Sequence, residues 1–229
     1  FEPVSRPSLE LVVKHLGELA LEEAARRLSL PVENGQAVPR DAGSLEDAIK
    51  QDNVGGLSKF LTSVAALEKP DSVGATPLIL AAIAGAAKVT KDLLSRGANL
   101  DATTSLDVEM HGLDDKGCTA LHVAAHFGHP LVVKALLLAN PVLIGVRTVG
   151  HKTAMYFAAR AGHAAVIEVL LLHEADAIDT GDQPALHVAS AFGNTECVQV
   201  LLQNDVNVNA LQSNGFSAIQ VAAWNGHAD

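Results

Sequence analysis

Two histidines are the first residues of this chain whose type and spacing suggest chemistry. His122 and His126 are four residues apart, so on a helix they would share one face and could bind a metal ion together. Zinc hydrolases of the His-Glu-x-x-His type have a glutamate directly after the first histidine, and this chain has Val123 there. We therefore expect structural histidines and no metal site.

Gly145 and Gly150 have the spacing of a phosphate-binding loop. Such a loop needs a lysine directly after the second glycine, because backbone amides and the ammonium group must reach the same phosphates. His151 stands at that position, and Lys152 follows one residue too late. We therefore expect no nucleotide and no other cofactor.

Cysteines and carboxylates give no catalytic pattern either. Cys118 and Cys197 form no Cys-x-x-Cys pair; Cys197 is expected in the core, and Cys118 in an exposed turn where it could be a reactive thiol. Acids recur at Asp71, Asp114 and Asp179, where a carboxylate can accept hydrogen bonds from its own turn. Since no two acids stand out as a general acid and base, this segment is predicted not to be an enzyme.

Composition limits the class of protein. The chain has 229 residues, of which 48% are hydrophobic and two are cysteines, which excludes a disordered chain and a disulfide scaffold. The few cysteines favour an intracellular location, cytoplasmic by default, although an organelle stays open because the first residue is Phe1 and not Met. No apolar run reaches about 18 residues, so no transmembrane segment is expected.

Acidic residues outnumber basic ones, and they are unevenly placed. The formal net charge of -10 argues against nucleic acid as the partner. Residues 161–229 contain eight acids and no Lys or Arg, so they carry -8 of that charge. This acidity is either an ordinary solvated face or a docking surface for a basic partner.

A repeated sequence pattern predicts the helices that position the histidines, cysteines and acids named above. Alanines recur at intervals of roughly 33 residues, the one longer interval containing an insertion at residues 103–112. A glycine follows most of these alanines by four residues, and a Leu-Leu pair follows that glycine, which predicts two short helices per unit. The recurring alanines are Ala48, Ala81, Ala124, Ala158, Ala189 and Ala222.

This pattern resembles the ankyrin repeat, whose signature is Thr-Pro-Leu-His-x-Ala in about 33 residues. Versions of the motif occupy residues 76–81, 119–124, 153–158, 184–189 and 217–222. The resemblance implies an all-α ankyrin-repeat solenoid, and it implies that the motif histidines, His122 and His187, form structural hydrogen bonds between neighbouring loops.

The register divides the chain into two parts. Residues 1–43 are expected to form a helical N-terminal extension and loop, which either caps the solenoid or docks on another subunit. Residues 44–229 form the ankyrin-repeat domain, in which the last unit lacks its second helix, so the parent protein is expected to continue or a partner to cover this end. Within this domain we expect a degenerate capping repeat at 44–70 and repeats from about 71, 114, 148, 179 and 212.

Partners of ankyrin proteins usually contact the turn tips and the outer face of each first helix. Carried over by position, this implies a partner-binding set that we call the partner row: His126, Phe127, Lys152, Arg160, Gln183, Phe192, Phe216, Trp224 and Asn225. Four of the eight aromatic residues fall in it. These rings are either interface anchors or packing residues between repeats.

The resemblance implies a protein–protein interaction scaffold or adaptor, alone or as a peripheral subunit of a larger assembly. Its partner is expected to have basic and apolar contact residues. The alternative is a regulatory ankyrin domain of a longer enzyme or channel whose catalytic or membrane part lies outside this segment.

Overall fold

A computed structural model describes most of the chain. The residues described are 44–71, 74–104, 113, 115–173 and 183–227. They belong to one compact unit, which comprises residues 42–108 and 113–229. The predicted N-terminal extension (1–43) and most of the insertion (105–112) lie outside the described residues.

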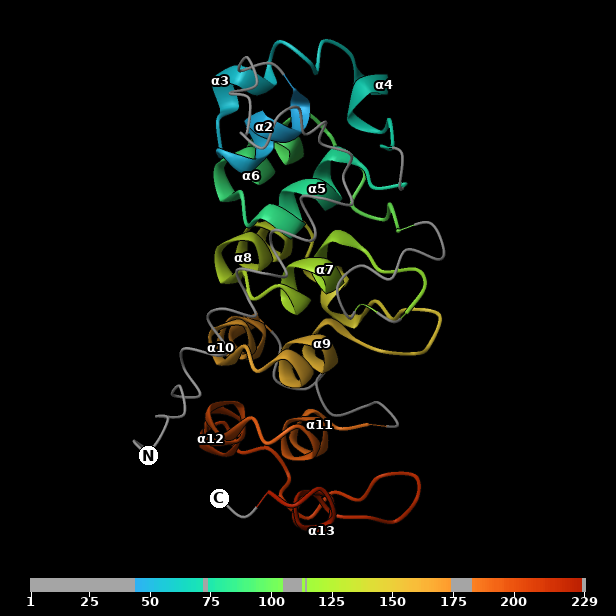
Figure 1. The fold of residues 1–229 in the computed structure, drawn as a ribbon, viewed down its shortest axis with the longest axis vertical. Coiled ribbons are helices and arrows are strands. Elements are labelled where there is room, and N and C mark those ends of the chain that lie inside the picture. Colours follow the sequence, from blue (N-terminus) through green and yellow to red (C-terminus); the bar gives the residue numbers. More distant parts are fainter. Residues whose placement is uncertain (1–43, 72–73, 105–112, 114, 174–182, 228–229) are drawn as a thin grey trace, which may run out of the picture. The chain divides into compact units, whose positions relative to one another are not determined.

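Pairs of antiparallel helices follow one another along this unit (Figure 1). The first helices of successive pairs contact each other, and so do the second helices, which gives two layers. The first-helix layer comprises α5 (Pro77–Ala84), α7 (Ala120–His126), α9 (Ala154–Ala161), α11 (Ala185–Ala191) and α13 (Ala218–Trp224). The second-helix layer comprises α6 (Ala87–Ser95), α8 (Pro130–Ala139), α10 (Ala164–His173) and α12 (Thr195–Gln203).

The fold of the described residues is all-α, as predicted. A short 3-10 helix, η1 (Pro141–Gly145), follows α8. Two isolated β-bridges have both partners in the described ranges, Thr103 to Thr119 and Leu211 to Ser217, each at the base of a loop that leads into a first helix.

The repeated motif starts the first helices. The hydroxyl of Thr76 accepts a hydrogen bond from the backbone N–H of Ile79, and Pro77 occupies the first helical turn, where its missing N–H costs nothing. Thr153 caps α9 in the same way through the N–H of Tyr156. Motif threonines therefore fix where these helices begin.

The core lies between the two layers and is built mainly from alanine on one side and larger aliphatic residues on the other. The motif alanines Ala81, Ala124 and Ala158 are fully buried, and their small side chains let the second helices approach closely. Phe157 on α9 is the largest fully buried side chain described. Its ring lies edge-on to that of His122, with 5.8 Å between the centroids.

His122 links two neighbouring loops, as the resemblance implied. Its Nδ1 accepts from the Thr119 hydroxyl at 2.9 Å, and its Nε2–H donates to the Val146 carbonyl at 3.1 Å. Burial lowers the pKa of His122 from 6.5 to about 4, although nearby carbonyl groups oppose the shift. The ring is therefore neutral at pH 7, and its two nitrogens are used in structural bonds and not in metal binding.

This buried histidine predicts a loss of stability in mild acid. The unfolded chain takes up a proton at His122 near pH 6.5, whereas the folded chain does so near pH 4. Between these values the unfolded state binds more protons, so the free energy of unfolding falls as the pH falls, by about 2 kcal/mol from pH 7.5 to pH 5. Urea unfolding at both pH values measures this change.

His122→Gln is the matched variant, because the last unit already has Gln220 at the equivalent position, where its Oε1 accepts from the Ser217 N–H at 2.9 Å. The variant should lose less stability between pH 7.5 and pH 5 than the native chain. An equal loss in both proteins would show that other groups cause the acid sensitivity.

Between residue 44 and α5 the structure describes three short helices: α2 (Leu45–Lys50), α3 (Val54–Leu57) and α4 (Val64–Leu67). The α2 helix contacts α5, and α3 contacts α6.

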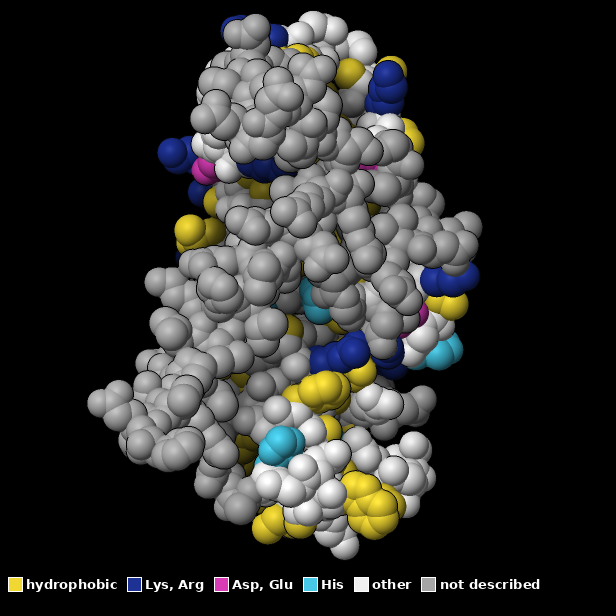
Figure 2. Space-filling view, viewed as in Figure 1, with side chains coloured by type: hydrophobic (Ala, Val, Ile, Leu, Met, Phe, Trp, Pro, Cys, Tyr) yellow, Lys and Arg dark blue, Asp and Glu magenta, His cyan; other side chains and the backbone are white. Residues whose placement is uncertain are grey.

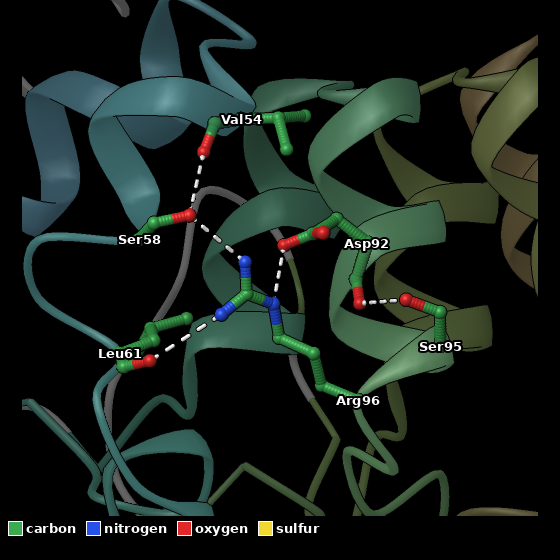
Figure 3. Close-up of polar contacts among 6 residues, drawn as sticks. All are labelled: Val54, Ser58, Leu61, Asp92, Ser95 and Arg96. Carbon is green, nitrogen blue, oxygen red and sulfur yellow. Dashed lines mark hydrogen bonds and ion pairs between the residues drawn. The ribbon is translucent and has the colours of Figure 1, made fainter.

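Arg96, just after α6, joins this region to the first described motif unit (Figure 3). Its guanidinium donates to Asp92 at 2.7 Å, to the Ser58 hydroxyl at 3.0 Å and to the Leu61 carbonyl at 3.3 Å.

Replacing Arg96 by alanine is expected to lower the free energy of unfolding by about 1–2 kcal/mol, because three charge-assisted hydrogen bonds are lost at a partly exposed site. Amide hydrogen exchange should speed up first in residues 44–67. Lys91→Ala, at an exposed position of the same α6 helix, is the control. Equal exchange rates in both variants would contradict a clamping role for Arg96.

Candidate functional site

The partner row lies along the first-helix layer, in the loops before these helices and at their C-terminal ends. Its accessibility follows from the register. The residue equivalent to Trp224 is partly accessible to solvent in each of the other units. These residues are Ile83, His126, Arg160 and Ala191. By contrast, Leu121, Met155 and Leu186 are buried at the motif position next to the core. Each first helix therefore presents one face to the core and one to solvent.

Two rings of the last unit form an exposed pair. Trp224 ends α13 with 84% of its surface exposed, and Phe216 lies in the preceding loop with 42% exposed. Their centroids are 6.5 Å apart at a tilted angle. Asn225, directly after Trp224, is also exposed and donates to the Val221 carbonyl at 2.9 Å.

Ile219 on α13 is 77% exposed, whereas its equivalents in the earlier units are buried. In the described part of the chain no second helix pairs with α13, so this core-facing side chain is uncovered. Its exposure therefore differs in origin from that of Trp224, whose position is accessible in every unit.

Cations and rings alternate from the loop before α9, along α9, to the residue that follows α11. The Arg160 guanidinium carbon lies 5.5 Å from the ring centre of Phe192, which is half exposed. The Lys152 Nζ lies 5.1 Å from the ring centre of Tyr156. Tyr156 was not among the predicted site residues, although its spacing of four residues from both Lys152 and Arg160 was a usable signal.

Of the remaining residues of the partner row, His126 and Phe127 are less exposed than Trp224, and Gln183 lies apart from the aromatic pair. Phe127 is half-buried and stacks on His129 with 6.5 Å between the centroids. His126 is also half-buried, edge-on to Phe127 and to the buried Phe157. Gln183 is exposed just before α11. In the second motif unit, therefore, the ring of Phe127 serves packing, which was one of the two expectations for the aromatic residues.

A buried carboxylate holds two loops of the row together. Asp115 accepts hydrogen bonds from the Thr148 hydroxyl at 2.6 Å, from the Lys116 N–H at 2.8 Å and from the Gly150 N–H at 3.0 Å. It lies 3.9 Å from the Lys152 Nζ, a long ion pair. These bonds explain why the glycine-spaced loop is a structural turn.

The expectation that Cys118 lies in an exposed turn is wrong, because its side chain is fully buried. Its thiol lies 3.4 Å from the Asp115 carbonyl, and in the same turn the Lys116 carbonyl accepts a hydrogen bond from the Val149 N–H. Cys197 is buried as expected, and burial raises the pKa of its thiol to about 11. Both thiols are thereby protected from solvent.

Most of the acids of residues 161–229 fall outside the described ranges. Those described, Glu168, Glu196 and Asp205, lie on α10 and α12 or directly after α12, in the second-helix layer. The described residues include no cluster of three His, Cys, Asp or Glu side chains that could hold a metal ion. Among the described helices none combines the length and apolar character needed to cross a membrane.

Comparison with known proteins gives one consistent result. Three ankyrin-repeat family models match the chain. The model of a single ankyrin repeat matches residues 73–105, the model of three ankyrin repeats matches residues 103–183, and the model of many ankyrin repeats matches residues 175–229. Together they cover residues 73–229. No curated protein matches the chain.

Proposed function

Because the chain belongs to the ankyrin-repeat family, whose repeats are generally protein–protein interaction modules, we propose that it is a scaffold or adaptor that binds a protein partner through the partner row. Proteins of this family are typically not catalytic, and we propose no reaction for this segment.

The observation that carries this proposal is the exposure of large rings at the accessible positions of the last two units. Phe192, Phe216 and Trp224 are each at least 42% exposed. Rigid aromatic side chains are over-represented among residues that dominate binding energy at protein interfaces. A partner that covers them needs apolar contact residues.

The distribution of charge along the sequence indicates the net charge of the partner. Residues 161–229 carry -8 of the net charge of -10, which would steer a basic partner toward this part of the chain. We therefore propose a partner of net positive charge, bound by the chain alone or within a larger assembly.

Affinity capture from a cell extract, read by mass spectrometry, tests the proposal. The native chain and a control, Leu172→Ala, should capture the same proteins, because Leu172 is 83% exposed but lies on α10 in the second-helix layer. The row variant Phe192→Ala/Trp224→Ala should lose them. Proteins retained by the row variant and lost by the control would contradict the proposal.

A further inference from the structure

The exposed pair of the last unit, Phe216 and Trp224, presents two aromatic rings at one surface site. The ring planes are tilted by 60° and the centroids are 6.5 Å apart, so the rings do not cover one another face to face. Trp224 is 84% exposed, at a position that is accessible in every unit, so its exposure comes from the repeat register. Figure 2, viewed as Figure 1, shows hydrophobic side chains at the surface over α13.

A ring of this kind attracts cations, because its face carries the negative end of a quadrupole. The chain itself uses this attraction one unit earlier, where the Arg160 guanidinium carbon lies 5.5 Å from the ring centre of Phe192. The other cation–π contact among the described residues takes its lysine from the same unit. The rings of Phe216 and Trp224 contact each other, and no Lys or Arg of the described residues lies over either of them.

The charge of the surrounding sequence favours a cation as well. Residues 161–229, which contain both rings of the pair, include eight acids and no Lys or Arg. This stretch therefore supplies no cation to its own rings, and its net charge of -8 attracts a basic side chain and repels an acidic one. The ring faces and the charge thus select the same kind of ligand.

The residue next to Trp224 adds a hydrogen-bond acceptor. The side-chain Nδ2–H of Asn225 donates to the Val221 carbonyl at 2.9 Å, and no donor of the described residues occupies its Oδ1. A guanidinium can stack flat on a ring while its in-plane N–H groups donate sideways, whereas the ammonium of lysine is compact and strongly hydrated. Two ring faces beside an exposed amide oxygen therefore suit arginine better than lysine.

We infer that the Phe216–Trp224 pair binds an arginine side chain of the protein partner. The guanidinium lies on the exposed indole face, its methylene groups contact Phe216, and its in-plane N–H groups point outward to acceptors such as the Asn225 Oδ1. This inference rests on the proposed function and assigns one contact of the basic partner. Trp224 then recognises charge, which a purely apolar anchor does not.

Selection from a library of short random peptides tests the inference. The native chain should enrich peptides that contain arginine. In a selected peptide, replacing that arginine by citrulline, which has nearly the same shape but no charge, should weaken binding at least about fivefold, and lysine should also weaken it. The protein is unchanged in this comparison, so misfolding cannot explain a difference. A citrulline or lysine peptide that binds as tightly as the arginine peptide would overturn the inference.

Fluorination of the indole tests the nature of the contact. Trp224 is the only tryptophan of the chain, so biosynthetic incorporation of mono-, di- and trifluorinated tryptophan changes this position alone. Fluorine withdraws electron density from the ring face and keeps the ring apolar, so each added fluorine should weaken binding of the arginine peptide further. Binding of the citrulline peptide, the matched control, should change little. An affinity for the arginine peptide that does not depend on fluorination would show an apolar contact and overturn the inference.

Two protein variants locate the contact. Trp224→Leu keeps an apolar side chain at this exposed position but removes the ring, and it should weaken the arginine peptide at least about fivefold. Leu172→Ala, at an exposed position of α10 in the second-helix layer, should leave the affinity unchanged. An equal loss in both variants would contradict a contact at Trp224.

The same selection separates the two proposals. If selected peptides lose binding with Phe192→Ala/Trp224→Ala but show no preference for arginine, the inference is wrong and the proposed function stands. If selected peptides bind equally well to that row variant, the proposed function is wrong, and the arginine contact fails with it.

Discussion

The double variant Phe192→Ala/Trp224→Ala is expected to weaken binding of the captured partner by more than about 2 kcal/mol, which is roughly 30-fold in Kd. Trp224 is 84% exposed and Phe192 half exposed, so truncation removes contact area from the interface and little from the core. Isothermal titration calorimetry with the purified partner measures the change.

The control for this variant is Leu138→Ala/Leu172→Ala, which removes two exposed apolar side chains from the second-helix layer. Its partner affinity should equal that of the native chain. Thermal unfolding of both variants should stay close to native, because neither removes a buried side chain. An unaltered Kd in the row variant would refute the aromatic anchors.

Phe157→Ala is expected to lower the free energy of unfolding by about 3–5 kcal/mol, the range typical for removing a buried phenylalanine. Its ring is fully buried on α9 and contacts His122 and His126 edge-on, so truncation leaves a cavity in the middle of the repeat array. Chemical unfolding followed by circular dichroism measures the loss.

Phe216→Ala provides the comparison, since this ring is 42% exposed and its loss should cost far less stability. If the two phenylalanine variants were equally stable, the placement of Phe157 in the core and of Phe216 at the surface would be incorrect.

The fold could be predicted because its determinants are local and repeated. Thr76 and Thr153 start helices through bonds to residues three positions later, and the motif alanine is buried in every unit except the last, where Ala222 is partly exposed. A residue such as His122 was recognisable as structural because its bonding partners, Thr119 and Val146, come from the same repeated register.

The candidate site was only partly predictable, because side-chain neighbours across repeats depend on packing. Register placed Phe127 and Phe192 at equivalent positions, yet Phe127 stacks on His129 while Phe192 lies beside Arg160. The thiol of Cys118 lies against the Asp115 carbonyl and is fully buried, which the turn residues around it did not indicate. The contact between Phe192 and Arg160 joins residues about one repeat apart, and no local pattern encodes it.

The central claim is that a protein partner covers the first-helix face of the last units, and site-specific photo-cross-linking in cells that express the chain tests it most directly. A photoreactive residue at position 192 or 224 should cross-link to the partner, and one at position 172 on α10 should not. Cross-linking of the same protein at position 172, with none at 192 and 224, would contradict the account.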